Sequence, residues 1–211
     1  MKLDKIIKLG SIKTSKIELI DITKAWIALS LAFTFIYAGA SIINGNISKV
    51  LTVSFLMMFV ISLFTAGLGF LLHELAHKFA AQYYGLTAEF RAFDQMLYLA
   101  MGLAVFIGFI FAAPGAVIIS GLVTRKENGI ISAAGPLTNY LLGIIFLVLL
   151  IFYPVVIKSI NIWSIGFSIN MWLGLFNMIP FGNLDGLKVF NWSKLVWILM
   201  VLTGIYFVFG F

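Results

Sequence analysis

The chain has 211 residues, of which 62% are hydrophobic and 10% are charged, and its mean hydropathy is +1.10. Soluble domains carry roughly 25% charged residues, so the composition excludes an ordinary soluble domain and indicates a multi-pass integral protein of the cell membrane, with the lipid bilayer as its surroundings. The net charge of +6 does not indicate nucleic-acid binding, because the lysines lie mostly at the ends of apolar segments, where they act on membrane topology.

The predicted organisation is a basic arm followed by one membrane domain. Residues 1–24 carry six lysines and are expected to form a cytoplasmic arm, either as a surface helix or as a pair of strands. Residues 25–211 are expected to form an all-α polytopic domain with about five to six transmembrane helices, a re-entrant segment and a short β element. The apolar stretches that predict these elements are 25–43, 50–84, 96–119, 130–152, 162–179 and 195–211.

Both histidines of the chain lie at the inner end of the second predicted span. His73 and His77 are four residues apart, so on a helix they share one face, with Cβ atoms ~6 Å apart. Two imidazoles placed in this way can hold one metal ion, and Glu74 can reach a water that serves as the fourth ligand. The His-Glu-x-x-His pattern also arises by chance, and the alternative is a pair of buried histidines that only pack and hydrogen-bond.

Asp185 is the best candidate for a third ligand. Without cysteine the chain can form neither disulfides nor thiolate metal sites, which leaves the two histidines and a carboxylate. Only Glu74 and Asp185 are expected to interrupt apolar surroundings, whereas the other acids are expected to be solvated. Two histidines and an acid form a typical catalytic zinc pattern. The local alternative for Asp185 is an ordinary turn, because Asn-x-Asp-Gly is a common turn composition.

Charge and metal geometry favour the same topology. If residues 96–119 enter and leave on one side, every lysine and arginine except Lys49 and Lys158 falls on the cytoplasmic side with the N-terminus. The same path brings His77 and Asp185 to one depth, because an even number of crossings then separates them. We therefore expect a re-entrant or in-plane segment bent at Pro114-Gly115, a short β run over 116–121, and a site open to the cytoplasm.

Three motifs together resemble the site-2 protease family of intramembrane zinc metalloproteases. They occur in the family's order over a core of about 50–186, and they are Leu72–His77, Ala134–Asn139, and Asn177–Pro180 leading to Leu184–Gly186. The resemblance implies that His73, His77 and Asp185 bind one zinc ion and that Glu74 is the catalytic base. The activity it implies is hydrolysis of peptide bonds in or near the transmembrane segments of single-span membrane proteins.

The resemblance also suggests how a substrate is held. Asn139 and Asn177 match asparagines that bind the substrate or the oxyanion, with interhelical packing as the alternative role for each. Residues 116–121 fall where the family has an edge strand near the substrate.

Other functions are compatible with parts of the pattern. A membrane metal transporter or sensor would carry the ion, but carriers usually place ligands at several depths, and this chain has one cluster. A non-catalytic protein that binds transmembrane helices would have no need of Glu74. A zinc hydrolase acting on a lipid or a prenylated peptide would fit the first motif alone.

Overall fold

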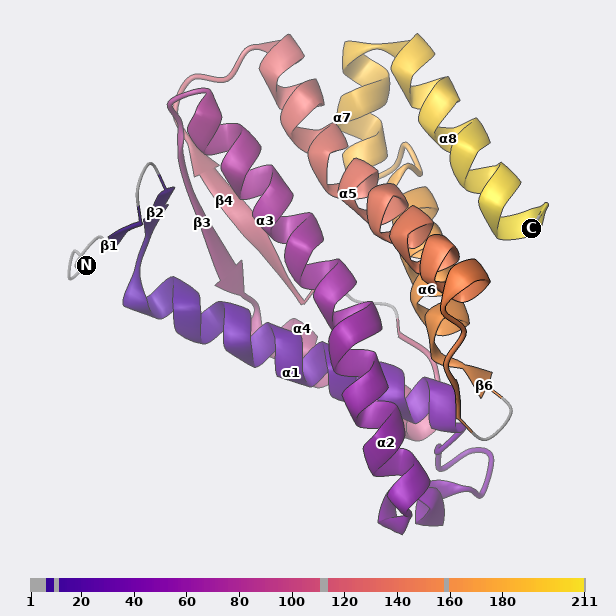
Figure 1. Ribbon diagram of the computed structural model, residues 1–211. Helices are drawn as coiled ribbons and strands as arrows, with labels where there is room; N and C mark the ends of the chain where they lie inside the picture. The colour runs from indigo at the N-terminus through magenta and orange to yellow at the C-terminus, as the bar shows by residue number, and fades with distance from the viewer. Residues whose placement is uncertain (1–6, 10–11, 111–113, 158–159, 211) are drawn as a thin grey trace. The chain divides into compact units, whose positions relative to one another are not determined.

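The computed structural model describes residues 7–9, 12–110, 114–157 and 160–210, and it is mostly helical (Figure 1). Residues 1–6 and 10–11 of the predicted arm, and Lys158, lie outside the described residues. The α-helices are α1 (Lys16–Ala38), α2 (Val53–Ser62), α3 (Leu68–Tyr83), α4 (Asp94–Ile107), α5 (Arg125–Phe152), α6 (Ile162–Asn177), α7 (Asp185–Trp192) and α8 (Lys194–Phe209). A 3-10 turn covers Ile47–Leu51, and a π-helical turn, Leu63–Gly67, joins α2 to α3.

Among the described residues, three helical segments are long and apolar enough to cross a membrane. They are α1 with 23 residues, the continuous helix Val53–Tyr83 with 31, and α5 with 28. About 20 residues are needed to cross a hydrocarbon core of about 30 Å. The helices α4, α6 and α8 have 14, 16 and 16 residues. The predicted helical architecture is thus confirmed, and the three long apolar helices are consistent with a membrane protein, whereas the number of five to six spans stays a prediction.

The predicted arm contains both a strand pair and the first turns of a helix. Strands β1 (Ile7–Leu9) and β2 (Ile12–Thr14) pair antiparallel, and α1 begins at Lys16. The hydroxyl of Ser15 accepts a hydrogen bond from the backbone N–H of Glu18, which is the usual way to start a helix. The first span therefore starts nine residues before the Ala25 expected from the apolar pattern.

One compact unit comprises residues 1–68 and 89–118. Here α1 packs against α2, the π-helical turn and α4. Its apolar core includes Phe35 of α1 and Phe55 of α2, whose rings meet edge to face with centroids 5.1 Å apart, and Ala104 of α4. The indole Nε1 of Trp26 donates to Leu63 O at 3.0 Å, so α1 satisfies a carbonyl of the π-helical turn.

The acid Glu18 corrects an expectation from the sequence. It lies in the basic arm and was expected to be solvated, but its side chain is fully buried. Its carboxylate accepts from the hydroxyl of Thr14 at 2.7 Å and from the backbone N–H of Phe90 at 2.8 Å. A buried carboxylate is stable only with such donors, and one of them is 72 residues away in sequence.

Substituting alanine for Glu18 is expected to destabilise the protein. The change leaves the N–H of Phe90 buried without the acceptor it has here, which costs about 1–3 kcal/mol. Glu18→Gln keeps one acceptor oxygen and should cost less. Thermal unfolding in detergent would measure both variants, and equal stability of Glu18→Ala and the wild type would contradict the expected role of this carboxylate.

The second compact unit comprises residues 69–88 and 119–211. Here α5 packs against α6 and α7, and α8 packs against α6 and α7. The core between α5 and α6 includes Tyr140, Phe146, Phe167 and Met171. The capping box of Thr124 and Glu127 fixes the start of α5. In the connection from α5 to α6, strands β5 (Val156–Ile157) and β6 (Ile160–Asn161) form a short antiparallel hairpin.

The strands β3 (Thr87–Ala92) and β4 (Gly115–Ser120) form a two-stranded sheet, and their arrows in Figure 1 run in opposite directions. Strand β4 confirms the predicted β run, whereas β3 was not expected in a stretch of mixed polarity. The pair is bonded at both ends: Phe93 N–H donates to Pro114 O at 2.9 Å, and the Thr87 hydroxyl donates to Ser120 O at 3.2 Å. The two ends of the segment 87–120 therefore lie next to each other.

Candidate metal centre

Helix α3 brings the two histidines together. The helix is continuous through residues 68–83, so His73 and His77 lie one turn apart on one face. Their ring centroids are 4.7 Å apart and the rings are nearly perpendicular. Both side chains are buried, with 5% and 8% of their surface exposed. Glu74, on the same helix, is half-buried and close enough to His77 to interact with it electrostatically.

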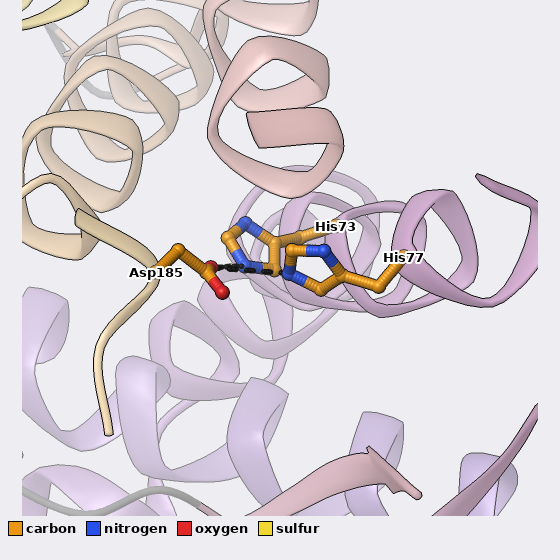
Figure 2. Close-up of side chains that lie close together, drawn as sticks. All are labelled: His73, His77 and Asp185. Atoms are coloured by element: carbon orange, nitrogen blue, oxygen red, sulfur yellow. Dashed lines mark ion pairs between the residues drawn. The ribbon is translucent and has the colours of Figure 1, made fainter. Parts of the chain in front are cut away.

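The carboxylate of Asp185 meets both imidazoles (Figure 2). Its Oδ2 lies 3.3 Å from Nε2 of His73 and 3.1 Å from Nε2 of His77. Asp185 directly follows the turn at residues 181–184, is the first residue of α7, and is 8% exposed. Gly186 allows the start of α7 to approach the backbone of Met178, because a Cβ at Gly186 would collide with it.

Hydrogen bonds at Nδ1 orient each imidazole so that its Nε2 faces Asp185. Nδ1 of His77 lies 2.7 Å from the carbonyl oxygen of Ile131, and a carbonyl can only accept. Nδ1 of His73 lies 2.5 Å from Oδ1 of Asn139. Both Nδ1 atoms therefore donate to these oxygens, and Nε2 of each ring is the nitrogen that faces Asp185. Two imidazole nitrogens and a carboxylate oxygen that converge in this way can bind one metal ion in place of the protons that would otherwise bridge them.

The arrangement fits a zinc ion. Zinc bonds of ~2.0–2.2 Å in a tetrahedron place neighbouring ligand atoms about 3.4 Å apart, close to the separations of 3.1 and 3.3 Å observed here. Two imidazoles and a carboxylate are also a ligand set that zinc prefers. Helix α5 leaves room for the ion at Gly135, where an added Cβ would press against Nε2 of both His73 and His77.

The charge on Asp185 suits this role. The ammonium of Lys188, one turn along α7, lies 3.9 Å from the other carboxylate oxygen, Oδ1. The carboxylate is thus an anion whose Oδ2 faces the histidines and whose Oδ1 faces a lysine.

The two asparagines expected to hold the substrate lie in different surroundings. Asn139 contacts His73, and its amide nitrogen donates to Gly69 O at 3.2 Å and to Oδ1 of Asn170 at 3.0 Å. The amide of Asn177 donates to Leu173 O of its own helix. Asn170 was not singled out from the sequence. The available signal was a lone amide in the middle of an apolar span.

The glycines that precede the histidines serve close packing of helices. A Cβ at Gly67 would collide with Ser30 and Trp26 of α1, and a Cβ at Gly69 would collide with the amide of Asn170. Both glycines therefore allow a neighbouring helix to come close.

Two curated proteins of Methanocaldococcus jannaschii are similar to this chain. One, named "Putative zinc metalloprotease", is 41% identical over 187 residues, which is 87% of this chain and 88% of that relative. The other, named "Zinc metalloprotease", is 26% identical over 159 residues, which is 75% of this chain and 39% of that relative. No protein-family model matches the chain, and neither does any solved structure.

Proposed function

Because the chain belongs to a family of zinc metalloproteases, we propose that it is an intramembrane protease of the site-2 type, which hydrolyses peptide bonds in or near transmembrane segments of other membrane proteins. The observation that carries the proposal is the convergence of His73 Nε2, His77 Nε2 and Asp185 Oδ2 on one point. The setting supports it, since three helices of the described chain are long enough to cross a membrane.

The residues around the metal position have separate tasks. His73, His77 and Asp185 would hold one zinc ion, which when bound supplies the Lewis acidity that makes water a nucleophile at neutral pH and polarises the scissile carbonyl. Glu74 takes the proton of the attacking water and delivers it to the leaving amine. It is half-buried and follows His73 directly on α3, next to the proposed metal position.

The path of residues 87–120 supports a cytoplasmic site. The bonded ends of β3 and β4 return the chain to where it started, so this stretch adds no net crossing if α3 ends at the membrane surface. In the proposed topology α5 and α6 cross and return, which agrees with the meeting of His77 and Asp185 in the structure. With the lysine-rich N-terminus in the cytoplasm, the site opens to that side.

Strand β4 offers a way to hold an unwound substrate. A transmembrane helix hides its peptide bonds in its own hydrogen bonds and must open before it can be cut. In the described residues β4 pairs with β3 alone, and Ile118 is 48% exposed. The free edge of such a strand can bind an extended segment by strand addition.

The proposal is tested with purified protein in lipid vesicles and a panel of single-span membrane proteins. We expect cleavage within or next to the transmembrane segment, located by mass spectrometry, which stops when a chelator removes the metal and returns when zinc is added back. Zinc flux across the vesicle membrane without cleavage would show a transporter instead. Cleavage of soluble peptides alone would contradict the intramembrane assignment.

A further inference from the structure

Two buried asparagines connect helix α6 to the imidazole of His73. Asn139 and Asn170 are both fully buried. The amide nitrogen of Asn170 donates to Gly166 O at 2.9 Å, and its Oδ1 accepts from Asn139 at 3.0 Å. Asn139 in turn presents its own Oδ1 to Nδ1 of His73 at 2.5 Å. The hydrogen bonds therefore run in one direction along a row of three side chains.

The direction of this row is fixed by backbone carbonyls. An asparagine amide can be turned over at little cost, and its orientation follows from its partners. The carbonyls of Gly166 and Gly69 can only accept, so each draws an amide nitrogen toward itself. With both nitrogens held in this way, Oδ1 of Asn170 faces Asn139, and Oδ1 of Asn139 faces His73.

We propose that Asn139 and Asn170 are positioning residues that keep His73 in the tautomer able to bind zinc. With Oδ1 of Asn139 as its partner, Nδ1 of His73 keeps its proton and Nε2 keeps a free lone pair. If the Asn139 amide turned over, its nitrogen would face Nδ1, and the proton would move to Nε2. Asn170 opposes that turn, because its oxygen accepts one of the two amide hydrogens of Asn139.

Helix α3 is shaped to accommodate the side chain of Asn170. The amide of Asn170 occupies the space that a side chain at Gly69 would need, so the glycine on the histidine-bearing helix makes room for it. His77 has no such arrangement, since a backbone carbonyl, Ile131 O, fixes its tautomer directly. The tautomer of His73 therefore depends on side chains, and mutation can test it.

This role differs from an oxyanion or substrate contact by Asn139. Both amide hydrogens of Asn139 are in use, one on Gly69 O and one on Asn170 Oδ1. An oxyanion would have to displace one of them. The two roles separate in experiment, because loss of an oxyanion donor lowers turnover at unchanged zinc affinity, whereas loss of a positioning residue lowers the zinc affinity itself.

The test compares Asn170→Leu with Asn170→Asp in the full-length protein. Zinc affinity is measured by competition with a chromophoric chelator, and the ligand geometry by the visible spectrum of the cobalt-loaded protein. Leucine cannot accept from Asn139, so we expect a 10–100-fold loss of zinc affinity. Aspartate keeps an acceptor for Asn139, so its zinc affinity should stay within about threefold of the wild type.

Asn177→Leu is the matched control. Asn177 lies on the same helix, and its amide makes the same bond to a carbonyl four residues back, at the same 2.9 Å. Its zinc affinity should equal that of the wild type. If Asn170→Leu does not fold, the pair Asn139→Asp and Asn139→Leu replaces it, with zinc affinity kept in the first and lost in the second.

The outcomes are distinct. The inference concerns the metal centre of the proposed protease and rests on that proposal. A wild-type protein that binds no zinc would contradict the proposed function itself. The other outcome is that the wild type binds zinc and the folded Asn170→Leu and Asn139→Leu variants bind it equally well. That result would be compatible with the proposed protease but would overturn the positioning role of the two asparagines.

Discussion

Replacing Glu74 by glutamine is expected to abolish peptide hydrolysis while the zinc site stays intact. The amide is nearly isosteric with the carboxylate but cannot take a proton from water. General bases contribute a factor of about 10²–10⁴ to rate, so turnover should fall by that amount. Because the proposed zinc ligands are His73, His77 and Asp185, zinc content measured by elemental analysis should stay at the wild-type level.

The control for this experiment is Glu127→Gln. Glu127 belongs to the capping box at the start of α5, a position where glutamine also serves. This variant loses a carboxylate but should cleave the same substrate at the wild-type rate. Cleavage that survives in Glu74→Gln would dismiss Glu74 as the base. Loss of zinc from Glu74→Gln would mean that the carboxylate holds the metal.

Adding a single methyl group at Gly135 is expected to destroy the metal centre. In Gly135→Ala the new Cβ would press against Nε2 of both His73 and His77, the two atoms that must face the ion. Neither imidazole can move away without breaking a hydrogen bond, because Nδ1 of His77 is bonded to Ile131 O and Nδ1 of His73 to Oδ1 of Asn139. We expect zinc affinity to fall by more than 100-fold and cleavage to be lost with it.

Gly102→Ala is the matched control for this change. Gly102 lies inside helix α4, and a Cβ there would meet nothing within 4 Å. Alanine at such a position should leave zinc binding unchanged and stabilise the protein by up to about 1 kcal/mol. Circular dichroism establishes that Gly135→Ala is folded before its zinc is measured. A folded Gly135→Ala protein with wild-type zinc affinity would refute the close approach of α5 to the site.

The residues of the candidate metal site could be picked out from the sequence because local rules determine most of the set. His73 and His77 share a face on any helix, and without cysteine the third ligand had to be a carboxylate. The short β run near Pro114 was also predictable, because β-branched residues follow one another there. The roles of Asn139 and Asn177 in binding a substrate stay predictions.

Interactions between distant residues could not be predicted. Glu18 was expected to be a solvated acid in a basic arm. Its carboxylate accepts from the backbone N–H of Phe90, which is 72 residues away, and no local sequence pattern predicts that bond. The residues of β3 have mixed polarity and do not show a strand pattern, and they form a strand because β4 pairs with them. The number of spans was not settled by apolar length alone, since α4 and α8 are apolar but short.

The sequence by itself determined a helical membrane chain with two imidazoles on one helical face, because periodicity and hydrophobicity act over a few residues. Only the tertiary structure decided that Asp185 meets those imidazoles, because two helices, α5 and α6, must fold back between them. It also decided which nitrogen of each histidine is free, since that depends on the acceptors Ile131 O and Asn139 Oδ1, supplied by another helix.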